Sequence, residues 1–69
     1  MECYFILNKG ANKEDAKISC AVLQGQLVAN PKGWDAFFSW DAAYKKMNEA
    51  AIQQQAQLMG FELEIVRYI

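Results

Sequence analysis

The residues from Ser39 to Gly60 constrain the fold most, because their apolar side chains recur with the period of one amphipathic helix. Good helix formers fill this run, and neither Pro nor Gly interrupts it. Ser39 is a suitable N-cap, and Gly60 is a suitable left-handed end. We therefore predict a single helix over residues 40–59, roughly 30 Å long. Its expected buried stripe comprises Trp40, Ala43, Tyr44, Met47, Ala50, Ala51, Gln54 and Leu58.

Three apolar residues of this run, Ile52, Ala56 and Met59, lie about 100–160° from the centre of that stripe. They can widen the buried face, or they can form a second contact line for a partner or for self-association. A second alternative concerns the start of the helix. Residues 34–36 nearly repeat residues 40–42, which leaves open a helix that begins at Asp35.

The flanking segments have the composition of β-strands. Residues 3–7 are an unbroken apolar run, typical of a strand that is covered on both faces. Residues 26–29 predict a short strand, residues 30–33 a turn, and residues 34–38 a returning strand. Alternation over residues 61–69 predicts the last strand, with Glu62, Glu64, Val66 and Tyr68 on one face.

Residues 13–24 fit two interpretations. As a helix they have Asn12 as a cap, Asp15 at the capping-box position and Gly25 at the end. As a strand they alternate from Ile18 onward and end in a hairpin turn at Gln24 and Gly25. We favour the helix, because Gln is a poor residue for the left-handed backbone of such a turn.

These elements assemble into a single α+β domain over residues 1–69, in which the helix over 40–59 packs on one face of an antiparallel sheet. The favoured element order is βαββαβ, which resembles the ferredoxin-like order. The resemblance rests on order alone. The alternative is a ββββαβ meander with a single helix.

The composition excludes most catalytic chemistry. The chain contains no His, and Cys3 and Cys20 have neither the number nor the spacing of zinc ligands. The acidic pairs Glu14–Asp15 and Glu62–Glu64 come with no further polar group, and the glycines stand singly. We therefore expect no enzyme, no metal site and no cofactor.

The charge distribution limits the partners. A net charge of −1 without a basic stripe argues against nucleic acid. No apolar run approaches the roughly 20 residues of a membrane span. The first residues lack the pattern of a secretory signal, and two Cys without such a signal are typical of a reducing compartment. We expect a cytoplasmic protein.

The apolar fraction is 54%, and nine residues are aromatic, which is more apolar surface than a small core hides. We therefore expect a protein partner or a homodimer, contacted through the sheet face that the helix leaves open. The candidate contact residues are Tyr4, Ile6, Asp35, Phe37, Ile52, Glu62, Glu64, Val66 and Tyr68.

The function that we expect is non-enzymatic protein binding. Very small, acidic domains without His are typical of phage and mobile-element accessory proteins, and an anti-CRISPR-like inhibitor that blocks a host protein complex fits this style. The alternatives are a structural homo-oligomer and a small-ligand or regulatory domain of the ferredoxin-like type.

Overall fold

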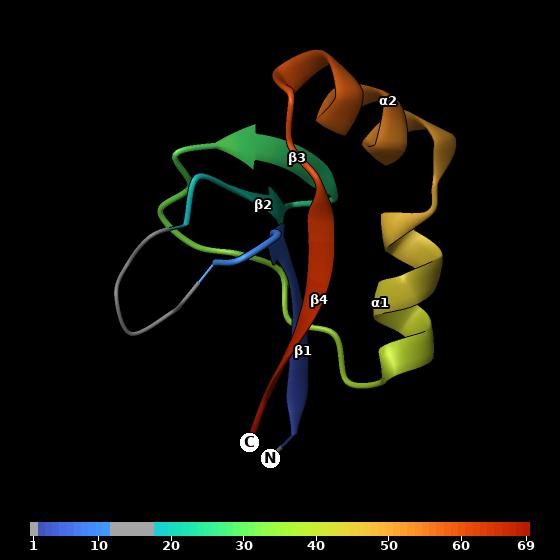
Figure 1. The fold of residues 1–69 in the computed structure, drawn as a ribbon. Coiled ribbons are helices and arrows are strands. Elements are labelled where there is room, and N and C mark those ends of the chain that lie inside the picture. Colours follow the sequence, from blue (N-terminus) through green and yellow to red (C-terminus); the bar gives the residue numbers. More distant parts are fainter. Residues whose placement is uncertain (1, 12–17) are drawn as a thin grey trace.

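The computed structural model describes residues 2–11 and 18–69 (Figure 1). A four-stranded sheet has the strand order β3-β2-β1-β4, and all adjacent strands are antiparallel. Figure 1 shows both helices on one side of this sheet. The predicted α+β class with an antiparallel sheet is confirmed. The elements are β1 (Cys3–Asn8), β2 (Cys20–Leu23), β3 (Gln26–Ala29), α1 (Trp40–Met47), α2 (Ala50–Met59) and β4 (Leu63–Tyr68).

The element order differs from the favoured prediction. Three strands precede two helices and a last strand, so the ferredoxin-like βαββαβ order is wrong. The end of the ambiguous segment is the strand β2, and Gln24 and Gly25 form the two-residue hairpin turn with φ angles of 53° and 77°. Residues 13–17 of the predicted helix lie outside the described residues. Gln24 occurs in this turn because one side chain from elsewhere in the chain, that of Asp35, accepts its backbone N–H at 2.7 Å.

The predicted returning strand over residues 34–38 is reduced to one bridge, so the ββββαβ alternative is nearer to the observed order but differs in this strand and in its single helix. This segment pairs with the sheet at one position, where Tyr4 and Phe37 exchange two backbone hydrogen bonds of 2.8 Å. The N–H of Asp35 donates to the carbonyl of Val22 at 2.8 Å. The segment therefore lies beside Val22 of β2 and Tyr4 of β1, and α1 begins directly after it.

The predicted single helix consists of two helices. The first begins at Trp40, as predicted from the Ser39 cap, so a start at Asp35 is wrong. It ends at Met47, and Asn48 and Glu49 separate it from α2. Asn is a weak helix former because its side chain bonds to nearby backbone groups. Here Nδ2 of Asn48 donates to the carbonyl of Tyr44 at 2.9 Å. The second helix ends at Gly60, with φ of 78°, as predicted.

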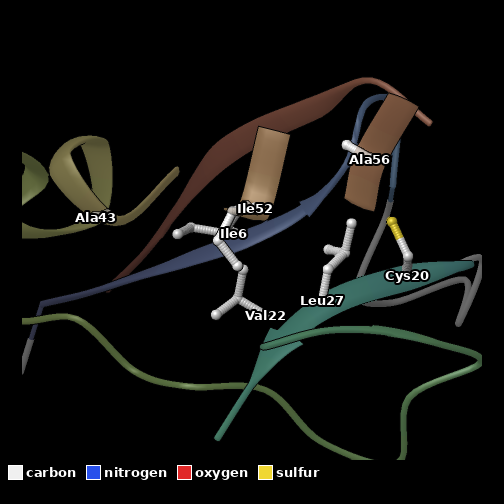
Figure 2. Close-up of a cluster of buried hydrophobic side chains, with 7 residues drawn as sticks. All are labelled: Ile6, Cys20, Val22, Leu27, Ala43, Ile52 and Ala56. Atoms are coloured by element: carbon white, nitrogen blue, oxygen red, sulfur yellow. The ribbon is translucent and has the colours of Figure 1, made fainter. Parts of the chain in front are cut away.

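The break rotates the buried face of α2 away from the predicted stripe. Ile52 and Ala56 are buried, and Met59 packs beside them, whereas Leu58 is 83% exposed. The buried face of α2 is therefore shifted to these residues and not widened, because Ala50, Ala51 and Gln54 of the predicted stripe are exposed as well. Figure 2 shows Ile52 above Ile6 and Val22, and Ala56 above Leu27. On α1 the contact with the core is made by Ala43 and Met47 alone among the predicted stripe residues.

The sheet face away from the helices is covered as well. Leu7 and Ala21 lie opposite each other on this face and have no accessible surface. Around Phe5, the ring of Trp34 lies at 5.7 Å and that of Tyr68 at 4.7 Å, measured between centroids. The prediction that the first strand is covered on both faces is confirmed. The predicted open sheet face is wrong at Leu7 and Ala21, which are buried, and the ring of Trp34 from the connection between β3 and α1 packs beside Phe5 on this face.

Candidate protein-binding surface

Three large side chains at the start of α1 are exposed. Phe38 is 70% exposed, and Trp40 and Tyr44 are each 48% exposed. The Ser39 side chain accepts a hydrogen bond from the N–H of Ala42 at 3.1 Å, which fixes the first turn. Residues four apart lie on the same helix face, so the rings of Trp40 and Tyr44 stack with centroids 4.7 Å apart and planes 18° apart. The helix therefore presents a preformed aromatic surface.

This aromatic pair lies on the flank of α1 that faces β4. The opposite flank carries Lys46, whose Nζ lies 3.7 Å from the position of a Cβ on Gly25 in the β2–β3 hairpin. Trp40 and Tyr44 lie roughly 120–160° around the helix from Lys46. Since α1 packs on β1 and β4, and β4 is at the opposite edge of the sheet from β3, this flank lies on the β4 side.

Within residues 2–11 and 18–69, no strand pairs with the adjoining edge of β4. In an antiparallel pair, successive residues direct their N–H and C=O alternately toward and away from the neighbouring strand. Tyr4 bonds to Phe37 on the far side of β1, so its partner in β4, Arg67, does not exchange bonds with it. The bond from the N–H of Lys9 to the carbonyl of Glu62 gives the same alternation, because it shows that Glu62 directs its carbonyl toward the β1 side. The outward groups are therefore those of Leu63, Ile65 and Arg67.

The other edge of the sheet has a side-chain partner. In β3, the N–H of Leu27 donates to Oε1 of Gln55 at 3.2 Å, so a side chain of α2 satisfies this one outward group. Among the described residues, no such partner faces the outward groups of β4. We define the α1–β4 surface as Phe38, Trp40 and Tyr44 together with the outward edge of Leu63, Ile65 and Arg67.

A charged group lies at one end of this surface. The carboxylate of Glu2 accepts hydrogen bonds from the hydroxyl of Tyr4 and from Nε of Arg67, the latter at 2.8 Å. The hydrogen bond from Tyr4, together with the nearby positive charge of Arg67, lowers the pKa of Glu2, although partial desolvation opposes the shift. The same hydrogen bond raises the pKa of Tyr4. The end of the β1–β4 pair is thus held by one acid, one phenol and one guanidinium.

Four of the predicted contact residues belong to the core beneath the helices. Ile6 has no accessible surface and Ile52 is 1% exposed, while Tyr4 and Phe37 pack against the same cluster. The prediction of Ile6 and Ile52 as partner contacts is therefore wrong, whereas Tyr4 and Phe37 are only partly buried. The error arose from the register, because Tyr4 and Ile6 lie opposite Arg67 and Ile65 and not on the face of Val66 and Tyr68.

The remaining predicted residues are dispersed. Asp35 is used inside the molecule, where its carboxylate accepts the N–H groups of Gln24 and Gly25 at 2.7 and 2.9 Å. Glu62 pairs with Lys9 at 3.4 Å, and Glu64 accepts the N–H of Gly10 at 3.0 Å. Val66 and Tyr68 are half-buried on the face away from the helices. The structure does not bring the nine residues together as one surface.

The residues that sequence reasoning missed are Phe38, Trp40 and Tyr44. The helical period placed Trp40 and Tyr44 in the buried stripe, because periodicity gives the relative positions of residues but not which sector meets the sheet. One signal was available. Two aromatic residues spaced by four, directly after an N-cap, can stack on each other and need no contact with the core.

No group of three or more His, Cys, Asp or Glu gathers among the described residues. Burial raises the pKa of the Cys20 thiol, which disfavours a reactive thiolate there. Among residues 2–11 and 18–69, neither helix is long and apolar enough to cross a membrane. Comparison with protein-family models, with curated proteins and with solved structures finds no match.

Proposed function

We propose that this chain is a non-enzymatic protein-binding domain and that it binds through the α1–β4 surface. The observation that carries the proposal is the stacked pair of Trp40 and Tyr44, which is half exposed beside a strand edge with free backbone groups. Aromatic residues are enriched in the cores of protein interfaces. An exposed strand edge is a template for a further strand.

The two parts of the surface favour the same class of partner. A strand that pairs with β4 satisfies the outward groups of Leu63, Ile65 and Arg67. The side chains that it directs toward the helices then contact Trp40 and Tyr44. A nucleic acid would need a cluster of basic residues around these rings, and Arg67, on the same surface, is already paired with Glu2. A protein with an extended segment is the partner that this chemistry fits.

We further propose the setting expected from the composition, in which the partner belongs to a host protein complex. An accessory protein of phage or mobile-element type, such as an anti-CRISPR-like inhibitor, acts by occupying a surface and needs no catalytic group. The acidic, His-free composition and the exposed aromatic rings support this proposal.

The test compares three tagged chains in lysates of the native host: the wild type, Trp40→Ser with Tyr44→Ser, and the control Leu58→Ser. Leu58 is 83% exposed on α2, so the control also removes an apolar side chain from a helix surface. We expect proteins that are retained by the wild type and the control but lost by the double variant. Titration calorimetry with the purified partner then measures the affinity.

The proposal fails if all three chains, shown to be folded by circular dichroism, retain the same proteins. A catalytic activity that survives in the double variant would contradict the non-enzymatic part of the proposal.

A further inference from the structure

The outward edge of β4 has a pattern that suits pairing with itself. The outward residues Leu63, Ile65 and Arg67 are evenly placed around Ile65. If two β4 strands run antiparallel with a twofold axis at Ile65, each outward residue of one strand lies opposite an outward residue of the other. Ile65 faces Ile65, and Leu63 faces Arg67. This register satisfies the free groups of both edges with about six hydrogen bonds.

The charges agree with this register. Glu64 of one copy lies opposite Val66 of the second copy, and Arg67 lies opposite Leu63. Like charges directly opposite each other destabilise a cross-strand pair, and this register places no two like charges opposite. Each Arg67 also keeps its own Glu2 at 2.8 Å, so its charge stays balanced within the chain.

The helices fit the same arrangement. Because α1 packs on β1 and β4, its axis lies about one strand spacing, roughly 5 Å, from such a twofold axis. The α1 helices of the two copies are then about 10 Å apart, which is the normal distance between packed helices. The flanks that face each other carry Trp40 and Tyr44. One symmetric contact thus covers both the free strand edge and the exposed aromatic pair.

We propose that the occupant of the α1–β4 surface is a second copy of this chain, whose β4 pairs antiparallel with β4 about Ile65 and joins the two sheets into one. This inference rests on the proposed function in one respect, since both identify the α1–β4 surface as the association surface; a host protein that binds there has to displace the second copy. The homodimer expected from the sequence through the Ile52–Ala56 line is excluded, because those residues are buried in the core.

The register is tested with single-cysteine variants in a Cys3→Ser background, since the remaining Cys20 is buried. Glu64 and Val66 of the two copies form a non-hydrogen-bonded pair, in which Cα atoms about 4.5 Å apart permit a disulfide. We expect a mixture of the Glu64→Cys and Val66→Cys chains to give a disulfide-linked dimer under mild oxidation. Neither chain alone should give one, because like positions lie too far apart.

The strand edge is tested with Arg67→Pro and its matched control Arg67→Ala. Both variants lose the ion pair with Glu2, but only Pro removes the outward N–H, which an edge strand tolerates. We expect light scattering to give the mass of two chains for the wild type. Arg67→Pro should weaken the dimer by about tenfold or more relative to Arg67→Ala, which corresponds to about 1.4 kcal/mol.

A wild-type chain that stays monomeric up to its solubility limit would overturn the dimer. Cross-linking of either cysteine chain alone, without the mixed product, would overturn the register. The proposed function is judged separately. The wild type can be monomeric and still retain a protein from the lysate that the Trp40→Ser, Tyr44→Ser variant does not retain. That result contradicts the dimer but supports the proposed function, with another protein as the occupant of the surface.

Discussion

The carboxylate of Asp35 holds the backbone of Gly25, because Oδ2 accepts its N–H at 2.9 Å while Oδ1 accepts the N–H of Gln24 at 2.7 Å. Both turn residues have positive φ, so their N–H groups converge and form a small anion-binding concavity. Asp35 lies ten residues beyond the turn, in the segment that leads to α1. A single side chain therefore fixes the β2–β3 hairpin and ties it to the start of the helical layer.

Replacement of Asp35 should destabilise the fold. We expect Asp35→Ala to lower the free energy of unfolding by about 1–3 kcal/mol, because two N–H groups lose a charged acceptor. Urea denaturation followed by circular dichroism measures the change. The control is Glu62→Ala, whose ion pair with Lys9 is exposed and should contribute at most about 1 kcal/mol. Equal losses in the two variants would contradict the bracing role of Asp35.

Replacement of Gln24 should have the opposite effect. Its φ of 53° costs an ordinary residue free energy that Asn largely avoids. We expect Gln24→Asn to raise the free energy of unfolding by up to about 1 kcal/mol. The same change at Gln26, in the extended backbone of β3, should give no gain, because Asn is disfavoured in strands. A gain at both positions would point to a cause other than the turn.

The choice of residues that α2 buries gives a prediction that distinguishes the observed structure from the single-helix interpretation. We expect Ile52→Ala to cost about 2–5 kcal/mol, because Ile52 fills the core between the helix and the sheet. Leu58→Ala should change the free energy of unfolding by less than about 0.5 kcal/mol, since Leu58 is exposed. If Ile52→Ala does not fold, Ile52→Val should cost about 0.5–1.5 kcal/mol. The single uninterrupted helix predicts the reverse ranking.

Local signals in the sequence were sufficient to predict those helix ends that depend on a single residue. The Ser39 cap and the left-handed Gly60 are confirmed, because each supplies a conformation or a hydrogen bond that its neighbours cannot. The break at Asn48 was missed for a different reason. Its cost is offset by side chains placed through the fold, such as Gln53, whose Nε2 donates to the carbonyl of Met47 at 2.7 Å.

The candidate surface could not be predicted, because it depends on relations between distant segments. The hairpin at Gln24 is stabilised by Asp35, and the pairing of Tyr4 with Arg67 decides which face of β1 meets the helices. An alternating pattern in one strand cannot state its register with another strand. The predicted contact residues in β1 were therefore assigned to the wrong face, while the exposed aromatic pair was assigned to the core.

The group of Glu2, Tyr4 and Arg67 gives a prediction for pH. The hydrogen bond from Tyr4 is the largest cause that lowers the pKa of Glu2 below its ordinary value of 4.5. A carboxyl whose pKa is lower in the folded chain stabilises the fold above its unfolded pKa, and this contribution is lost as the pH falls through the folded pKa. We expect NMR titration of the Glu2 carboxyl to show the low pKa in the wild type and a shift back toward 4.5 in Tyr4→Phe. Tyr44→Phe, which removes a hydroxyl from α1, should leave the titration unchanged. A wild-type Glu2 that titrates at 4.5 would show that the contact with Tyr4 does not persist in solution.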